Sequence, residues 1–274
     1  MLNRGMHAVE TSTGLRERLQ RRICALNKVI VAFSGGVDST VVVKAAMEAL
    51  GNSKVIAATG VSPSLASREL ELVRRIAGEL GVKLELVNTE EMADAKYVAN
   101  NGDRCYHCKT ELYSKLVELA RRDDASVING VNADDAGDHV HGIRAMREFG
   151  VIAPLAEIGM TKADVRELAR EMGLPNWEKP ALACLSSRVA YGIPVTIETL
   201  NRVERGERFL LDRGFVNVRV RHHGKIARVE VDTQDVARLV QSPLREELTA
   251  HLMQLGYTYV TLDLRGFRSG SGNE

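Results

Sequence analysis

The amino-acid sequence predicts an α/β protein with a doubly wound parallel sheet, followed by a second, smaller α+β domain. Strand-like and helix-like segments alternate up to residue 176, as they do where helices connect parallel strands. The first strand-like segment, residues 29–33, is apolar and mostly β-branched, and a turn at Gly35 and Gly36 follows it. After Pro194 the alternation stops, and two strand-like segments flank a short turn. The two parts of the chain therefore have different architectures.

The first part is expected to alternate strands and helices in a regular order. The expected strands are residues 29–33, 54–59, 83–87 and 126–130. The expected helices are residues 41–47, 67–80, 111–121 and 162–172. Thr161 has the side chain and position of an N-cap for the last helix, and Gly173 ends it. In such a sheet, ligands bind at the carboxyl ends of the strands.

The second part begins after a segment rich in Pro, Ser and small residues. We expect a helix over 196–213, paired strands over 216–221 and 226–232, two short helices and a last strand over 258–264. We predict a nucleotide-binding domain over residues 1–176 and a cysteine-bearing loop over 177–194. A small α+β domain for substrate binding or oligomerisation follows over 195–265, and a disordered tail over 266–274.

Charge and composition favour a cytoplasmic enzyme. The 274 residues carry a formal net charge of +1, so no overall field attracts nucleic acid or acidic membranes. Residues 1–15 are mostly polar and indicate no signal peptide, and no apolar stretch approaches the ~20 residues of a membrane-spanning helix. Thiols stay reduced in the cytoplasm, so the four cysteines indicate chemistry or metal binding rather than disulfides.

The turn after the first strand has the composition of a phosphate site. Residues 34–40 read Ser-Gly-Gly-Val-Asp-Ser-Thr. The glycines Gly35 and Gly36 allow backbone amides to converge on an anion ahead of a helix N-terminus. The hydroxyls of Ser34, Ser39 and Thr40 are expected to hold the departing pyrophosphate.

Asp38, in the same turn, is the expected Mg²⁺ partner, because Mg²⁺ takes one or two carboxylates together with phosphates. No lysine follows the glycines, which excludes the GxxxxGK[ST] loop. The motif instead resembles the PP-loop of the ATP pyrophosphatase superfamily. A turn without a ligand is the alternative.

The cysteines form the second pattern. Cys105 and Cys108 make a C-x-x-C in a polar loop just before an expected helix, and Cys184 lies in a later loop. Three thiolates can hold three irons of a [4Fe–4S] cluster and leave the fourth iron open; a zinc site and unliganded thiols are the alternatives. Cys184 is also the strongest nucleophile of its loop. Cys24, in a helical pattern, is expected to be buried.

Basic side chains supply candidates for phosphate binding. Lys162 and Arg188 are expected to offset negative charge on phosphates. Arg219 and Arg221, two apart on a strand, share one face, and Glu230 on the partner strand is placed to orient one of them. A solvated charged strand is the alternative.

Other polar residues remain open. Residues that follow a strand end form either part of the ATP site or a simple polar turn: Asn132, Asp134 and Asp135. No role is assigned to five histidines: His107, His139, His141, His222 and His223.

Over nearly its whole length the chain resembles the LarE-type ATP-dependent sulfur transferases, which take part in synthesis of the nickel-pincer nucleotide of lactate racemase. The matching stretches are VAFSGGVDST, DRCYHCK, NGVNADD, GMTKADVRELAREMGLP, PALACLSSR and RVRHHGKIARVEV. The resemblance implies a PP-loop domain, a smaller C-terminal domain and a homo-oligomer.

The implied reaction uses ATP and Mg²⁺ to adenylylate the carboxylate of a pyridinium carboxylate mononucleotide, and then replaces a carboxylate oxygen by sulfur. The resemblance also implies that Arg219 and Arg221 bind the mononucleotide phosphate. In some members of the family the cysteine matching Cys184 gives up its own sulfur, whereas in others three cysteines carry a [4Fe–4S] cluster. Because this chain has Cys105, Cys108 and Cys184, the cluster route is favoured.

Three other functions are alternatives. An ammonia-dependent PP-loop synthetase of the NAD or GMP type has no need of the C-x-x-C or of Cys184. A tRNA thiolation enzyme would be expected to carry a basic RNA-binding extension, which the near-neutral charge does not indicate. A non-enzymatic ATP sensor would leave the cysteines without a role.

Overall fold

The computed structural model describes residues 12–135, 140–180 and 183–268. Contacts divide the chain into two compact units. The first consists of Met1–Gly60, Glu71–Val87 and Lys109–Pro180, and the second of Val61–Leu70, Asn88–Cys108 and Ala181–Glu274. The second unit thus takes in 61–70 and 88–108, which the sequence placed in the nucleotide-binding domain. The domain boundaries at 176 and 194 stay a prediction.

A parallel four-stranded sheet forms the centre of the first unit, in the order β3-β2-β1-β4. Its strands are β1 (Val29–Ala32), β2 (Val55–Val61), β3 (Lys83–Asn88) and β4 (Ser126–Ile128). Val31 pairs with Ala57 on one side and Ile128 on the other, and an isolated parallel bridge joins Ile128 to Ile152. The predicted parallel α/β architecture is confirmed.

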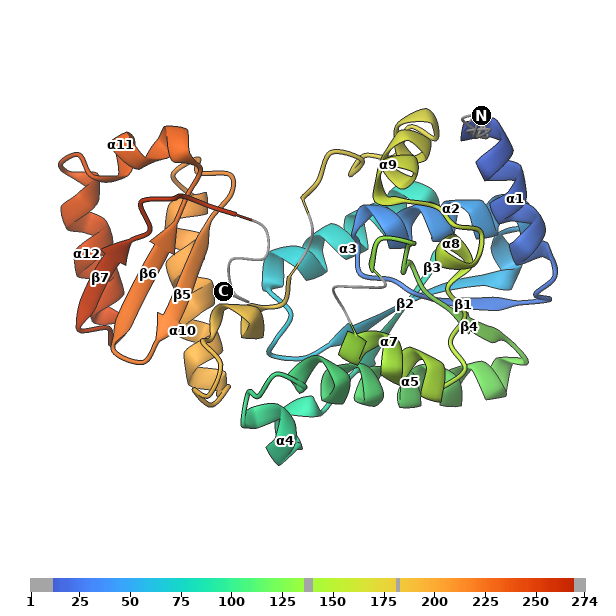
Figure 1. Cartoon of the computed structure of the whole chain (residues 1–274), viewed down its shortest axis with the longest axis horizontal. Coiled ribbons are helices and arrows are strands. Elements are labelled where there is room, and N and C mark those ends of the chain that lie inside the picture. The colour runs from blue at the N-terminus through green and yellow to red at the C-terminus, as the bar shows by residue number, and fades with distance from the viewer. Residues whose placement is uncertain (1–11, 136–139, 181–182, 269–274) are drawn as a thin grey trace, which may run out of the picture. The chain divides into compact units, whose positions relative to one another are not determined.

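Helices cover both faces of this sheet: α2 and α3 lie on one face, and α5 and α7 on the other (Figure 1). The helical elements of this part are α1 (Ser12–Cys24), α2 (Val37–Leu50), η1 (Asn52–Lys54), α3 (Ser67–Leu80), α5 (Arg104–Asp123), α7 (Val140–Glu148), α8 (Pro154–Glu157) and α9 (Lys162–Glu171). All of Val29, Ile30 and Val31 in β1 are buried, and Val29 and Val31 lie in one apolar core with residues of α2 and α3. The buried sheet positions the loops at its carboxyl edge.

The second unit contains a smaller three-stranded sheet, in the order β5-β6-β7. The strands β5 (Arg219–His223) and β6 (Ile226–Glu230) form an antiparallel hairpin, and β7 (Tyr259–Leu262) is parallel to β6. The helical elements are η2 (Glu91–Ala93), α4 (Ala95–Val98), η3 (Leu185–Arg188), α10 (Ile197–Leu211), η4 (Thr233–Asp235), α11 (Val236–Leu239) and α12 (Leu244–Gln254). One face of the sheet packs on α10 and α12 through a separate apolar core. The predicted smaller α+β part is therefore present.

Several local predictions can be compared with the structure. Helix α3 has the predicted bounds, and Thr161 caps α9 in a capping box with Asp164. Cys24 was predicted to be buried, but it is exposed at the end of α1, so that prediction is wrong. Phe267, at the start of the predicted tail, donates its N–H to Val231 O at 2.8 Å, and residues 269–274 lie outside the described residues.

The start of α5 also differs from the prediction. The C-x-x-C lies in the first turns of this helix rather than in a loop before it. The helix begins at Arg104, where the backbone oxygens of Asn101 and Asp103 accept the N–H groups of Arg104 and Tyr106. Because Asn101 and Asp103 are polar, the sequence shows no apolar helical periodicity at this end of the helix. No helix among the described residues is both long enough and apolar enough to cross a membrane.

Candidate functional site

The turn between β1 and α2 forms a loop of the kind that binds phosphate. Gly35 has a φ of +71°, the left-handed conformation that glycine adopts without strain. Gly36 is the N-cap of α2, and no side chain caps this helix end. The Ser39 hydroxyl donates to Gly36 O at 3.1 Å and lies 3.1 Å from the Ser34 hydroxyl. The amides of the first turn of α2 thus remain free for an anion.

Two residues behind the loop hold its backbone in place. Asn176, which the sequence analysis missed, is buried and donates to Gly35 O at 3.0 Å and to the Thr40 hydroxyl at 2.9 Å. A Cβ on Gly130 would lie 2.6 Å from Ser39 N, so only glycine permits this close approach. The Thr40 hydroxyl is buried and donates to Gly36 O at 2.8 Å. Thr40 therefore shapes the loop, and its contact with pyrophosphate stays a prediction.

A polar cluster lies beside the loop, within the first unit. Lys162 Nζ donates to the carboxylate of Asp38, and Asn132 Nδ2 donates to its other oxygen at 3.1 Å. Asp134 accepts the Lys162 N–H at 2.7 Å, and Asp135 accepts that of Asn132 at 3.0 Å. The structure thus brings together Asp38, Lys162 and the polar residues after β4, as the hypothesis of an ATP site requires.

The three candidate cysteines belong to the second unit, and none of them forms a disulfide with another described residue. Cys105 and Cys108 are one turn apart on α5, and Cys184 is the N-cap of η3. Cys105 and Cys184 are exposed, and Cys108 is half-buried against a small core that includes Tyr97 and Leu185. Cys105 and Cys184 are therefore accessible to solvent, and Cys108 is less so.

Arg104 and Tyr97 lie among these cysteines. Arg104 Nη1 donates to Ser186 O at 2.9 Å and to the side-chain oxygen of Asn100, and Tyr97 Oη lies 2.6 Å from Ser186 Oγ. Burial would lower the pKa of Arg104, but Cys184 raises it, so the net shift is upward. Burial raises the pKa of Tyr97, and Cys184 and Cys108 add to this effect. The two residues respond electrostatically to all three thiols, because Cys105 also acts on Arg104.

Arg188 anchors the loop that carries Cys184. Its guanidinium is buried and pairs with Glu207 at 2.9 Å and 3.3 Å. It also donates to Ala183 O at 2.6 Å and to Cys184 O at 2.9 Å. All these interactions fix the loop, so a contact of Arg188 with substrate stays a prediction.

The hairpin arginines differ from each other. Arg221 is buried and bidentate to Glu230, with distances of 2.9 Å and 3.2 Å, and its Nη1 donates to Ser187 O at 3.0 Å. Arg219 forms no ion pair with a carboxylate in the described part of the chain. Burial, together with Arg188 and other arginines, lowers the pKa of Arg219 to about 10. Arg219 instead donates to Val218 O at 2.7 Å, and its guanidinium carbon lies 5.0 Å from the centre of the Phe267 ring.

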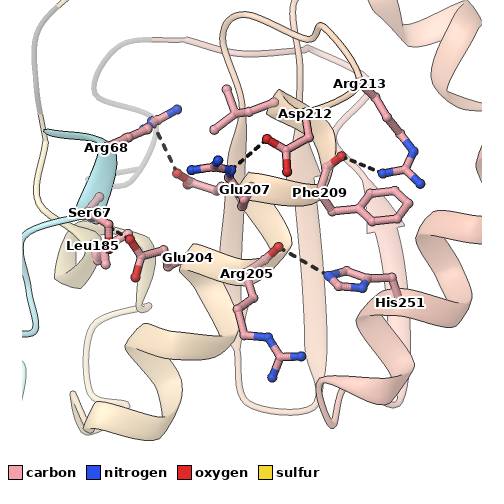
Figure 2. A pocket seen from close by; sticks show the side chains of 13 residues that line it. Ser67, Arg68, Leu185, Glu204, Arg205, Glu207, Phe209, Asp212, Arg213 and His251 are labelled. Carbon is pink, nitrogen blue, oxygen red and sulfur yellow. Dashed lines mark hydrogen bonds and ion pairs between the residues drawn. The ribbon is translucent and has the colours of Figure 1, made fainter. Parts of the chain in front are cut away.

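A pocket of about 420 Å³ lies on the second unit. Figure 2 shows Arg68 and Glu207 facing each other at its edge, 3.6 Å apart, with Leu185 and Glu204 nearby. Because Leu185 directly follows Cys184, the pocket reaches the cysteine loop. At its other end, His251 stacks on Phe209 with ring centroids 4.6 Å apart.

Side chains of the types that bind metal ions, the histidines included, form no metal site among the described residues. No three His, Cys, Asp or Glu side chains among residues 12–135, 140–180 and 183–268 form a group that fits one metal ion. His107 lies 3.2 Å from Asp94 and 3.3 Å from Asp103. His139 lies outside the described residues.

The sequence analysis missed the residues that support the predicted ones. Asn100, Arg104, Asn176 and Glu207 are buried polar side chains that bind loops far away in the sequence. The only signal for Arg104 was its position next to Cys105, inside the stretch DRCYHCK.

Comparisons with known proteins agree with this geometry. Residues 8–111, which contain the loop between β1 and α2, match the NAD synthase family. The pyridinium-3,5-bisthiocarboxylic acid mononucleotide synthase of Lactiplantibacillus plantarum is 37% identical over 250 residues, which cover 91% of this chain and 90% of that protein. An uncharacterised protein of Synechocystis sp. is 44% identical over 258 residues, or 94% of this chain and 96% of that protein.

Argininosuccinate synthases are more distant. That of Methanothermobacter thermautotrophicus is 30% identical over 168 residues, which cover 56% of this chain and 42% of that protein. The match to the mononucleotide synthase, in contrast, extends over both compact units. The chain is an ATP-using, sulfur-transferring enzyme, and it belongs to the LarE family of PP-loop proteins.

Proposed function

We propose that this enzyme adenylylates the carboxylate of a pyridinium carboxylate mononucleotide and converts that carboxylate to a thiocarboxylate. The product would serve synthesis of the nickel-pincer cofactor of lactate racemase. The observation that carries the proposal is the 37% identity, over 91% of the chain, to a protein named for a bisthiocarboxylic acid mononucleotide product. We also propose that it acts in the cytoplasm as a homo-oligomer, as the family resemblance implies.

Activation is assigned to the first unit. A carboxylate oxygen of the substrate attacks the α-phosphorus of ATP, and pyrophosphate leaves. The uncapped amides at the start of α2 and the hydroxyls of Ser34 and Ser39 are suited to hold this pyrophosphate. Lys162 adds a positive charge there. A sulfur nucleophile then attacks the carbonyl carbon, and AMP leaves with one of the original carboxylate oxygens.

Asp38 is the proposed Mg²⁺ ligand. Its carboxylate is partly exposed and is bound by an exchangeable ammonium group, that of Lys162. Mg²⁺ needs only one or two protein carboxylates when substrate phosphates complete its coordination, so this donor set fits. The ion would neutralise charge on the phosphates.

Cys105, Cys108 and Cys184 are the proposed holders of a [4Fe–4S] cluster. The set fits because the three cysteines belong to one unit, are not bound in disulfides among the described residues, and together act on one buried pair, Arg104 and Tyr97. A cluster needs each thiolate on a separate iron. When bound, it would supply sulfide for transfer.

The mononucleotide phosphate is assigned to the arginines of the β5–β6 hairpin. Arg219 is a half-buried cation whose positive charge is disfavoured by Arg188, Arg68 and Arg221. An arriving phosphate would relieve this repulsion and accept charge-assisted hydrogen bonds. Glu230 holds Arg221 in a fixed orientation, and we assign Arg188 a supporting role beside the same phosphate.

The test is product analysis. The anaerobic enzyme is incubated with ATP, Mg²⁺, a sulfide source and the pyridinium dicarboxylate mononucleotide. We expect AMP, pyrophosphate and a thiocarboxylate, all dependent on the mononucleotide. ADP with phosphate, or AMP formation that requires ammonia and yields an amide, would contradict the proposal.

A further inference from the structure

Arg104 is a buried cation without a carboxylate partner. It is 4% exposed, and no ion pair with Asp or Glu involves it anywhere in residues 12–135, 140–180 and 183–268. Its partners are neutral: Ser186 O, the side-chain oxygen of Asn100 and the ring of Tyr191, 5.6 Å from the guanidinium carbon. Buried guanidinium groups are ordinarily paired, because an unpaired buried charge is costly.

Arg188 provides an internal comparison. It is equally buried and also donates to backbone oxygens of the cysteine loop, at Ala183 and Cys184. Glu207 neutralises it at 2.9 Å. Both arginines therefore hold the loop, but only Arg104 keeps an uncompensated charge. Binding of the cysteine loop does not by itself explain the positive charge of Arg104, because a neutral side chain could also donate a hydrogen bond to Ser186 O.

Two cysteines and two tyrosines act electrostatically on Arg104, and the effect of Cys184 is the largest of the four. The bond to Ser186 O holds the guanidinium of Arg104 beside η3, whose N-cap is Cys184, and both Cys184 and Cys105 act electrostatically on this guanidinium. Tyr97 lies on the same Ser186, but its high pKa keeps the phenol neutral. The positive charge is thus directed at the cysteines.

We propose that Arg104 is the fixed counter-charge of the sulfur site, and that its guanidinium stabilises negative charge on the sulfur atoms held by Cys105 and Cys184. The inference rests on the proposed function, since it takes the three cysteines as holders of an iron–sulfur cluster. Net charge and hydrogen bonding near such a cluster set its reduction potential. Arg104 acts through the sulfur atoms and is a positioning residue.

The experiment compares four full-length proteins after anaerobic iron–sulfur reconstitution: the wild type, Arg104→Gln, Arg104→Lys and Tyr97→Phe. Iron content and the midpoint potential of the visible absorbance are measured. Tyr97→Phe is the matched control, because it removes another bond to Ser186 and leaves the charge unchanged. We expect Arg104→Gln to shift the equilibrium between the reduced and oxidised cluster at least tenfold towards the oxidised form. This corresponds to a midpoint potential lower by about 59 mV for a one-electron couple. Arg104→Lys and Tyr97→Phe should stay near the wild type.

Equal potentials in Arg104→Gln and Arg104→Lys would overturn the proposal, and so would an equal shift in Tyr97→Phe. If Arg104→Gln holds no iron, retention by Arg104→Lys supports a role for charge, whereas loss by both with retention by Tyr97→Phe overturns it. A wild type without iron would refute the cluster and this inference together. Iron in the wild type with no effect of Arg104→Gln would refute this inference alone.

Discussion

The ammonium of Lys162 donates to the carboxylate of Asp38, although 124 positions separate them in the sequence. Asp38 lies in the first turn of α2, and Lys162 is the first residue of α9. Both side chains are partly exposed, with relative exposures of 20% and 32%. The pair is therefore accessible to solvent, and in the proposed function Mg²⁺ replaces the lysine at the carboxylate while the lysine binds phosphate.

Asp38→Asn should stop activation without unfolding the protein. A partly exposed ion pair is worth at most about 1 kcal/mol, so urea unfolding should change little. Loss of charge from the proposed magnesium ligand should lower pyrophosphate release by about 10²-fold. Glu48→Gln is the control. Glu48 lies on α2 like Asp38 but far from the loop, and the change removes its ion pair with Arg16 of α1. Undiminished pyrophosphate release in Asp38→Asn would exclude this assignment.

Gly130→Ala should weaken ATP binding. The new Cβ would lie 2.6 Å from Ser39 N and 2.8 Å from the Asp38 carbonyl carbon, and these backbone atoms would have to move. Gly78→Ala is the control, because no atom lies within 4 Å of its Cβ position and alanine stabilises a helix by about 0.5–1 kcal/mol. Calorimetric titration with ATP should separate the two variants. If both bind ATP like the wild type, the close approach at Gly130 does not shape the loop.

Arg219→Met should weaken mononucleotide binding by about 1.5–3 kcal/mol and leave ATP binding nearly unchanged. The folded pKa of Arg219, about 10, is below the usual value of a guanidinium. The folded protein therefore bears a penalty in stability that is complete below pH 10 and fades as the pH rises above 10. At pH 7 the variant should consequently be no less stable than the wild type.

Arg221→Met should behave differently. It removes the bidentate partner of the buried Glu230, which still pairs with Arg228 at 3.0 Å. Complete loss of pairing would cost about 3–5 kcal/mol, so with Arg228 in place thermal unfolding should reveal a smaller but clear destabilisation. If Arg219→Met and Arg221→Met were equally stable, the ion pair between Arg221 and Glu230 would not contribute to the free energy of unfolding.

The cysteine variants distinguish two sulfur sources. If a cluster is held jointly, Cys105→Ala, Cys108→Ala and Cys184→Ala should each lose iron and sulfur transfer, but they should retain adenylylation. If Cys184 gives up its own sulfur, only Cys184→Ala stops transfer, and used protein becomes lighter by one H₂S. Intact-protein mass spectrometry after one turnover measures this difference. We expect an unchanged mass with iron bound.

The sequence predicted those features that depend on local pattern. The β-branched run of β1, the periodicity of α3 and the cap at Thr161 each reflect neighbouring residues, and the structure contains all three. The loop at Gly35 was recognisable because its glycines and hydroxyls are consecutive.

The supporting contacts were not predictable, because they join distant segments. Asn176 binds Gly35 across 141 positions, and Arg104 binds Ser186 across 82. No periodicity connects such pairs, since tertiary packing alone selects them. The polar first turn of α5 likewise lacks the apolar spacing from which helices are recognised. The sequence motifs therefore identified the candidate site residues. The side chains that bind the backbone of their loops, such as Asn176 and Arg104, could be identified only from the structure.

The most direct test of the central claim follows oxygen. The enzyme is given the mononucleotide with oxygen-18 in its carboxylates, together with ATP, Mg²⁺ and sulfide, and the AMP is analysed by mass spectrometry. Adenylylation predicts that each thiocarboxylate formed is accompanied by one AMP that carries one oxygen-18 atom. AMP without the label, or label recovered in pyrophosphate or inorganic phosphate, would contradict activation of the carboxylate as an acyl-adenylate.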